Sequence, residues 1–162
     1  VYKRQPLYGQ RHSIRPMWRP LVAALLVGSS ASIVSAVLVA WALGGSLETI
    51  LSLAPKSASM PFALPVAERL GGLASLAAVA VAITGILGAV VARPVLNALG
   101  IENHAVRGFA VGLTAHAIGT ARALQVSETA GAFSALAMGL NGLATAVLVP
   151  LFIALLQWLG MP

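Results

Sequence analysis

Two short stretches of the sequence combine cationic and hydroxyl side chains that could bind a small anion. In the first stretch, Lys56 stands between Pro55 and Ser57. In the second, LTAHAIGTARAL, His116 and Arg122 lie among small residues. An ammonium group neutralises a carboxylate, a guanidinium group can bind one through two parallel hydrogen bonds, and an imidazole exchanges protons near neutral pH. These residue types predict recognition of a carboxylate anion, with His116 as a candidate for proton coupling.

Each of these side chains also has a structural interpretation, which the sequence leaves open. The Lys56 ammonium could extend to the membrane surface and bind lipid phosphate, and a single histidine in an apolar segment is often a hydrogen-bonded packing residue. Arg122 could pair with Glu128 or with lipid, although Glu128 is also a candidate for proton coupling. Asn141, in GLNGL, is of a type that hydrogen-bonds between membrane helices.

The composition indicates an integral membrane protein, because 59% of the 162 residues are hydrophobic and only 9% are charged. Soluble domains carry about 25% charged residues. Three uncharged runs are long enough to cross a bilayer, which requires about 20 residues. We expect these spanning helices at about residues 21–43, 73–92 and 132–159, the second ended by Arg93 and Pro94.

Two polar segments between these runs, about residues 54–70 and 108–124, are predicted to be broken or re-entrant. Pro55, Pro61 and Pro65 oppose a continuous helix in the first, because proline lacks an amide donor and crowds the preceding turn. Backbone at membrane depth must satisfy its hydrogen bonds, so both segments should face protein or a watery cavity. Where a half-helix begins, its free amides favour an anion.

The positive charge is concentrated at the start of the chain. Five of its ten Lys and Arg residues lie within residues 1–20, directly before the first apolar run. This pattern places the basic N-terminal segment in the cytoplasm, so it does not indicate a nucleic-acid partner. The polar connection after the second span is also basic, and it predicts that the first two spans run in opposite directions. We expect a multi-pass membrane protein, surrounded by the lipid bilayer.

A shift of sixty positions reveals an internal repeat. Residues 53–77 align without gaps to residues 113–137, and eight of the twenty-five pairs are identical. The shift sets Lys56 against His116 and Glu68 against Glu128. Because the spans that lead into the two copies point in opposite directions, the repeat is predicted to be inverted, with residues 21–162 as one transmembrane domain. Inverted repeats with interrupted segments are typical of secondary transporters.

The sequence contains no recognisable enzyme signature, and we expect no enzymatic activity. The chain has no cysteine and no aspartate, and it lacks the H-E-x-x-H, G-x-S-x-G and P-loop patterns. We therefore expect neither a catalytic residue nor a metal site nor a cofactor.

Three stretches resemble the LrgB/CidB family: GFAVGLTAHAIGTARALQVSETAGAFSALAMGLNGLATAVLVPL at 108–151, the earlier LSLAPKSASMPFALPVAERLGG, and TGILGAV. The similarity covers nearly everything from about residue 17, and H-x-I-G-T-A-R and A-M-G-L-N-G are its specific motifs. Family members have further helices before this region, which with the initial Val predicts an N-terminally truncated member. The resemblance implies an all-α polytopic protein of the bacterial cytoplasmic membrane.

The same resemblance implies two kinds of activity. Relatives in plant plastids transport glycolate and glycerate, and bacterial members with an LrgA-type partner are linked to pyruvate uptake. The family was first described as antiholin-like, modulating murein hydrolase export and cell lysis. The family blocks carry the predicted substrate-binding residues Lys56, Ser57, Ser59, His116, Gly119, Thr120, Arg122 and Asn141.

The sequence thus predicts a transporter of small monocarboxylates with proton coupling. The alternative is an antiholin-like regulator that acts through an LrgA/CidA-type membrane partner. Assembly as a homo-oligomer is compatible with both.

Overall fold

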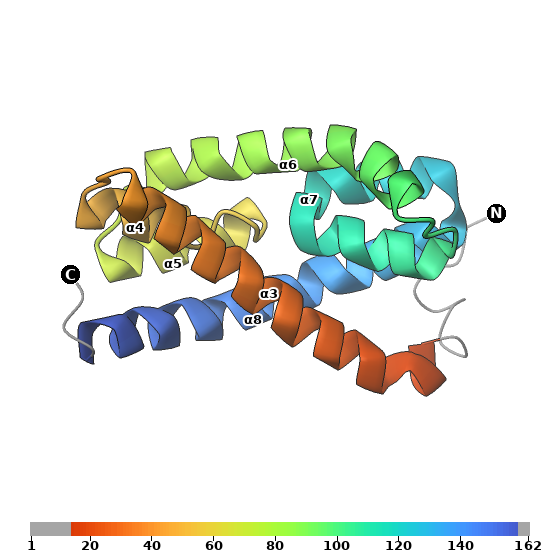
Figure 1. Ribbon diagram of the computed structural model, residues 1–162, viewed down its shortest axis with the longest axis horizontal. Coiled ribbons are helices and arrows are strands. Elements are labelled where there is room, and N and C mark those ends of the chain that lie inside the picture. The colour runs from red at the N-terminus through yellow and green to blue at the C-terminus, as the bar shows by residue number, and fades with distance from the viewer. Residues whose placement is uncertain (1–13, 159–162) are drawn as a thin grey trace.

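The computed structural model describes residues 14–158, and within that range the protein is all-helical (Figure 1). A single 3-10 turn leads directly into six α-helices. The elements are η1 (Arg15–Met17), α3 (Trp18–Ala42), α4 (Leu47–Leu53), α5 (Met60–Leu70), α6 (Ala74–Ala98), α7 (His104–Val126) and α8 (Glu128–Trp158). The predicted all-α class is confirmed, whereas residues 1–13 of the basic N-terminal segment lie outside the described residues.

Three helices are long and apolar enough to cross a membrane: α3 with its preceding turn, α6 and α8. With 25 residues in α3 and α6 and 31 in α8, their lengths are roughly 38 to 46 Å at a rise of 1.5 Å per residue. The hydrocarbon core of a bilayer is about 30 Å thick. The prediction of three spanning helices is confirmed, and the chain is a multi-pass membrane protein.

The second spanning helix is longer than the sequence predicts. We expected Arg93 and Pro94 to end it, but α6 continues through Pro94 to Ala98. Neighbouring helices can compensate in a membrane for the hydrogen bond that a proline removes, so Pro94 is tolerated inside the helix. One side of α6 exposes large apolar side chains, including Val79, Ile83 and Leu87, as expected for contact with lipid.

The helices α4 and α5 form a hairpin at one end of the molecule (Figure 1). Ser46 caps α4 by accepting a hydrogen bond from the Thr49 amide at 3.2 Å. The break between the helices covers residues 54–59 and contains Pro55. The expectation that all three prolines interrupt this segment is wrong: Pro61 lies in the first turn of α5, where no amide donor is needed, and Pro65 lies inside that helix.

Helix α7 is also a hairpin, because its chain reverses at His116. This residue has φ 38° and ψ −130°, which is not helical, and it divides α7 into a first arm (104–115) and a second arm (117–126). Gly119 lies so close to Val111 and Ala115 that a Cβ atom there would overlap both side chains. The second arm therefore returns beside the first, and α7 occupies the end of the molecule opposite to α4 and α5 (Figure 1).

Glycines allow the first arm of α7 to pack tightly on α8. A Cβ atom at Gly108 would overlap the backbone of Ala130, and one at Gly112 would overlap the backbone of Ser134. This close approach fixes the depth to which the α7 hairpin enters the bundle.

Candidate functional site

The breaks in the two hairpins meet at the side chain of Asn141, in α8. Its Nδ2 donates to the backbone oxygen of Ser57, in the first break, at 2.8 Å. The same nitrogen donates to the backbone oxygen of Leu113, near the end of the first arm of α7, at 3.2 Å. Its Oδ1 accepts a hydrogen bond from Ser29 Oγ, in α3, at 2.6 Å. One amide thus joins both hairpins to two of the three spanning helices.

This junction, which we define as Ser29, Ser32, Ser57, Leu113 and Asn141, lies deep within the bundle. Asn141 is 1% exposed, and Ser29 and Ser57 are also buried. Ser29 is near the middle of α3 and Asn141 near the middle of α8. The Oγ atoms of Ser32 and Ser57 are 2.6 Å apart, within hydrogen-bond distance. Polar groups at this depth are costly unless they are paired, and here they pair with one another.

Ser59 adds an unpaired hydroxyl close to the junction in sequence. Its side chain is buried, and its Oγ is the only buried side-chain polar atom within residues 14–158 that has no hydrogen-bond partner. Leaving such a group unpaired costs about 1 to 3 kcal/mol. A bound ligand or water molecule would remove this cost, so Ser59 is a group that the fold leaves available.

Lys56, in the same break, is half-buried. Its backbone amide donates to Leu53 at 3.1 Å, but no residue between 14 and 158 gives its ammonium a hydrogen bond or an ion pair. A cation in this position requires water, a lipid phosphate or a bound anion. The geometry therefore keeps open both the substrate-binding and the lipid-binding interpretation of Lys56.

His116, at the break in α7, is held firmly by its surroundings. His116 is 3% exposed, and its Nε2 lies 2.9 Å from the Val81 backbone oxygen in α6. Because a carbonyl oxygen can only accept, Nε2 carries a hydrogen and Nδ1 is left as an acceptor in the neutral ring. Gly85 provides the space, since a Cβ atom there would lie 2.5 Å from His116 Cε1.

Thr120 and Ser134 complete the support of this second break. Thr120 Oγ1 donates to the backbone oxygen of His116 at 2.7 Å and lies 2.8 Å from Ser134 Oγ, in α8. Glu128 is exposed in the first turn of α8, nearly two helical turns before Ser134. The structure thus separates His116 and Glu128, the two residues predicted to couple proton movement.

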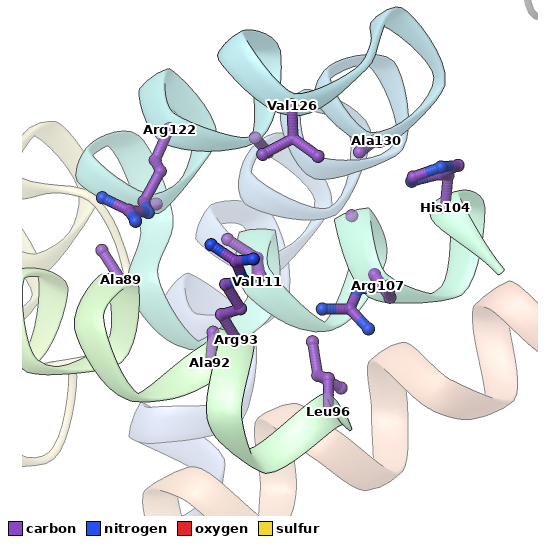
Figure 2. Close-up of a pocket in the computed structure, with 13 residues that line it drawn as sticks. Ala89, Ala92, Arg93, Leu96, His104, Arg107, Val111, Arg122, Val126 and Ala130 are labelled. Carbon is purple, nitrogen blue, oxygen red and sulfur yellow. The ribbon is translucent and has the colours of Figure 1, made fainter. Parts of the chain in front are cut away.

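Gly119 and Arg122 lie away from the junction, on a pocket between α6 and the two arms of α7 (Figure 2). Its volume is about 310 Å³, and four basic side chains line it: Arg93, His104, Arg107 and Arg122. The predicted site residues therefore fall into two groups, those in and around the breaks and those at this basic pocket.

Sequence reasoning missed several members of both groups. Arg93 and Arg107 were interpreted only as topology signals. Ser29 and Ser32 were not singled out, although their spacing places both on one face of an apolar helix. That spacing is the signal that could have identified them. Within the described range, no three His, Asp or Glu side chains are grouped so that they could hold a metal ion.

Comparison with known proteins shows which family and which relatives this chain is similar to. The model of the LrgB-like family matches residues 5–155. An uncharacterized protein of Haemophilus influenzae (strain ATCC 51907 / DSM 11121 / KW20 / Rd) is 32% identical over 153 residues, which cover 94% of this chain and 66% of that protein. The Antiholin-like protein LrgB of Bacillus mycoides (strain KBAB4) is 29% identical over 91% of this chain and 64% of its own length.

A second Antiholin-like protein LrgB, from Bacillus cereus (strain B4264), is 28% identical over the same shares of the two chains, 91% and 64%. The chain therefore spans slightly less than two thirds of the length of these relatives. No solved structure matches it.

Proposed function

Since this chain belongs to the LrgB-like family, as its sequence motifs predicted, we propose that it forms part of a membrane carrier for small monocarboxylates of the glycolate, glycerate or pyruvate type. The observation that carries the proposal is the junction at Asn141, where two broken segments meet near the middle of two spanning helices. Discontinuous helices that meet at mid-depth are the usual construction of a carrier's binding site.

The available polar groups around this junction suit a single carboxylate. In the proposal, the Lys56 ammonium neutralises the anion and the unpaired Ser59 hydroxyl donates a hydrogen bond to it. Ser57, Thr120 and Asn141 hold the two breaks at the correct separation. Arg122, beside Gly119 on the basic pocket, attracts the anion toward the membrane from that end.

Proton coupling and the inverted repeat are further parts of the proposal. His116 would exchange a proton through Nδ1, and Glu128, exposed in the first turn of α8, would take part separately at the surface. The repeat is supported by the placement of Lys56 and His116, which the sixty-residue shift aligns, in the breaks of two separate hairpins. Transport of this kind changes no covalent bond of the substrate, so we propose no enzymatic activity.

Transport by the full-length protein in proteoliposomes tests this function. We expect Lys56→Gln to lower the initial rate of radiolabelled glycolate or pyruvate uptake at least tenfold, because the carboxylate loses its neutralising charge. Arg69→Gln, which removes an exposed cation from α5, is the matched control and should retain the wild-type rate. Equal uptake by wild type and Lys56→Gln, at equal amounts of inserted protein, would refute the role of Lys56.

The names of two relatives favour a second candidate function, an antiholin-like regulator of cell lysis. Such a regulator would act by assembling with an LrgA/CidA-type membrane partner or with further copies of itself. Vesicles that contain both proteins and leak a dye only together, without exchanging labelled monocarboxylates, would support regulation. Saturable exchange by this protein alone would support the carrier.

A further inference from the structure

The basic pocket contains more positive charge than a monocarboxylate carrier requires. Arg93 comes from the last turns of α6, Arg107 from the first arm of α7 and Arg122 from the second arm. Figure 2 shows the three side chains around one space, with His104 at its rim. The remaining lining residues are small or aliphatic.

No carboxylate offsets this charge at the pocket, because no Glu is among the described residues that line it. Three guanidinium groups around one space repel one another, and the apolar walls screen that repulsion less than bulk water does. An anion with several negative oxygens would relieve it. The pocket is also accessible, since Arg93 and Arg122 are exposed and Arg107 is half-buried.

Part of the pocket is already ordered for binding. Arg107 Nη1 donates to the Ile101 backbone oxygen at 2.7 Å, which fixes the guanidinium plane. Only one of its five donor hydrogens is needed for that bond, so the others remain for a ligand. A guanidinium fork matches the oxygens of a phosphate in geometry and in charge.

The position of the pocket in the bilayer points to the same chemistry. Arg93 lies near the end of α6, and Arg15 and Arg19 lie at or just before the start of α3. The end of α6 and the start of α3 are at the same end of the molecule (Figure 1). By the positive-inside pattern, we expect this end of the spanning helices at the level of lipid headgroups and of cytoplasmic solutes.

We propose that the basic pocket formed by Arg93, Arg107 and Arg122 binds a phosphoryl group. The group belongs either to a soluble phosphomonoester or to the headgroup of an anionic phospholipid. The site goes beyond the proposed transport function, because Arg93 and Arg107 have no part in that function. Arg122 belongs to both sites and is therefore left unchanged in the test.

Binding to the purified full-length protein tests the site in two arms. The first measures glycerol 3-phosphate binding by calorimetry in detergent. The second compares the thermal unfolding midpoint in nanodiscs of phosphatidylcholine with and without phosphatidylglycerol. We expect saturable binding or a raised midpoint in at least one arm. Arg93→Gln/Arg107→Gln should weaken it about tenfold or more, because two charged hydrogen-bonding groups are lost.

Arg69→Gln removes one cation from the opposite end of the molecule and should behave as the wild type in both arms. If the double variant does not fold, Arg93→Gln alone replaces it in both arms, because Arg93 is at an exposed position. Binding in the first arm identifies a soluble phosphomonoester, and a response only in the second identifies a lipid headgroup. No response of the wild type in either arm, or an equal response of the arginine variants, overturns the proposal.

Discussion

At the scale of single residues, the fold depends on polar groups that satisfy one another inside an apolar bundle. Asn141 uses both ends of its amide, donating to Ser57 and Leu113 and accepting from Ser29. Replacing it would leave two backbone oxygens and one hydroxyl without their partner. Hydrogen bonds between membrane helices contribute from about 0.6 to 2 kcal/mol, so the loss should be measurable.

We expect Asn141→Ala to lower the free energy of unfolding by roughly 1 to 2 kcal/mol. Chemical unfolding in mixed micelles, followed by circular dichroism, measures this change. Asn97→Ala, at an exposed position near the end of α6, is the control and should leave stability nearly unchanged. If both variants unfold alike, the junction is not a source of stability.

His116 shows how a strained residue can be retained. Its positive φ costs of order 1 to 3 kcal/mol for a residue other than glycine. The hydrogen bonds to Val81 and from Thr120, together with the space beside Gly85, offset that cost. The residues predicted to bind substrate thus include some, such as His116 and Asn141, whose observed contacts are structural.

At the scale of elements, the two hairpins differ in what breaks them. Residues 54–59 contain Pro55, and Pro61 lies in the first turn of α5, so local sequence accounts for much of the first hairpin. The reversal in α7 has neither proline nor glycine at its centre. It is held by hydrogen bonds to other helices, between His116 and Val81 in α6 and between Thr120 and Ser134 in α8.

Tight packing of α7 on α8 gives a prediction at this scale. We expect Gly112→Ala to destabilise the protein by about 1 to 3 kcal/mol, because the new Cβ would overlap the Ser134 backbone and move the arm away from α8. Thermal unfolding in detergent measures the loss.

Gly139→Ala is a matched control within α8, since a Cβ there would have no neighbour within 4 Å. It should be neutral or slightly stabilising, because alanine favours a helix by about 1 kcal/mol over glycine. A Gly139→Ala variant as unstable as Gly112→Ala would contradict the packing described.

At the scale of the whole molecule, the two hairpins enter the bundle from opposite ends. This arrangement predicts that α4 and the segment before α7 lie on opposite sides of the membrane. Glu48, in α4, and Glu102, before α7, are both exposed and lie at opposite ends. The chain contains no cysteine, so single cysteines can report the side of the membrane.

We expect a membrane-impermeant maleimide to label Glu102→Cys only from the cytoplasmic side and Glu48→Cys only from the other side. The basic residues at the start of α3 and the end of α6 set this orientation. Labelling of right-side-out and inside-out vesicles makes the comparison. Reaction of both cysteines from one side would exclude the arrangement of the two hairpins.

The sequence by itself determined that the protein lies in a membrane, how many helices span it, and to which family the chain belongs. Apolar runs and the positions of Arg and Lys indicate the membrane and the spanning helices locally, because a bilayer selects on segment length, apolarity and charge. The family depends on the motifs H-x-I-G-T-A-R and A-M-G-L-N-G. Pro55 likewise indicated a break that the structure contains.

Only the tertiary structure decided which polar groups meet. Asn141 forms hydrogen bonds to residues in two distant segments. Gly112 is packed against the backbone of a neighbouring helix, whereas Gly139 has open space where a Cβ would lie. Arg122 joins Arg93 and Arg107 at one pocket because α7 turns back at His116. Such contacts depend on how helices pack in three dimensions, and no pattern along one chain specifies that packing.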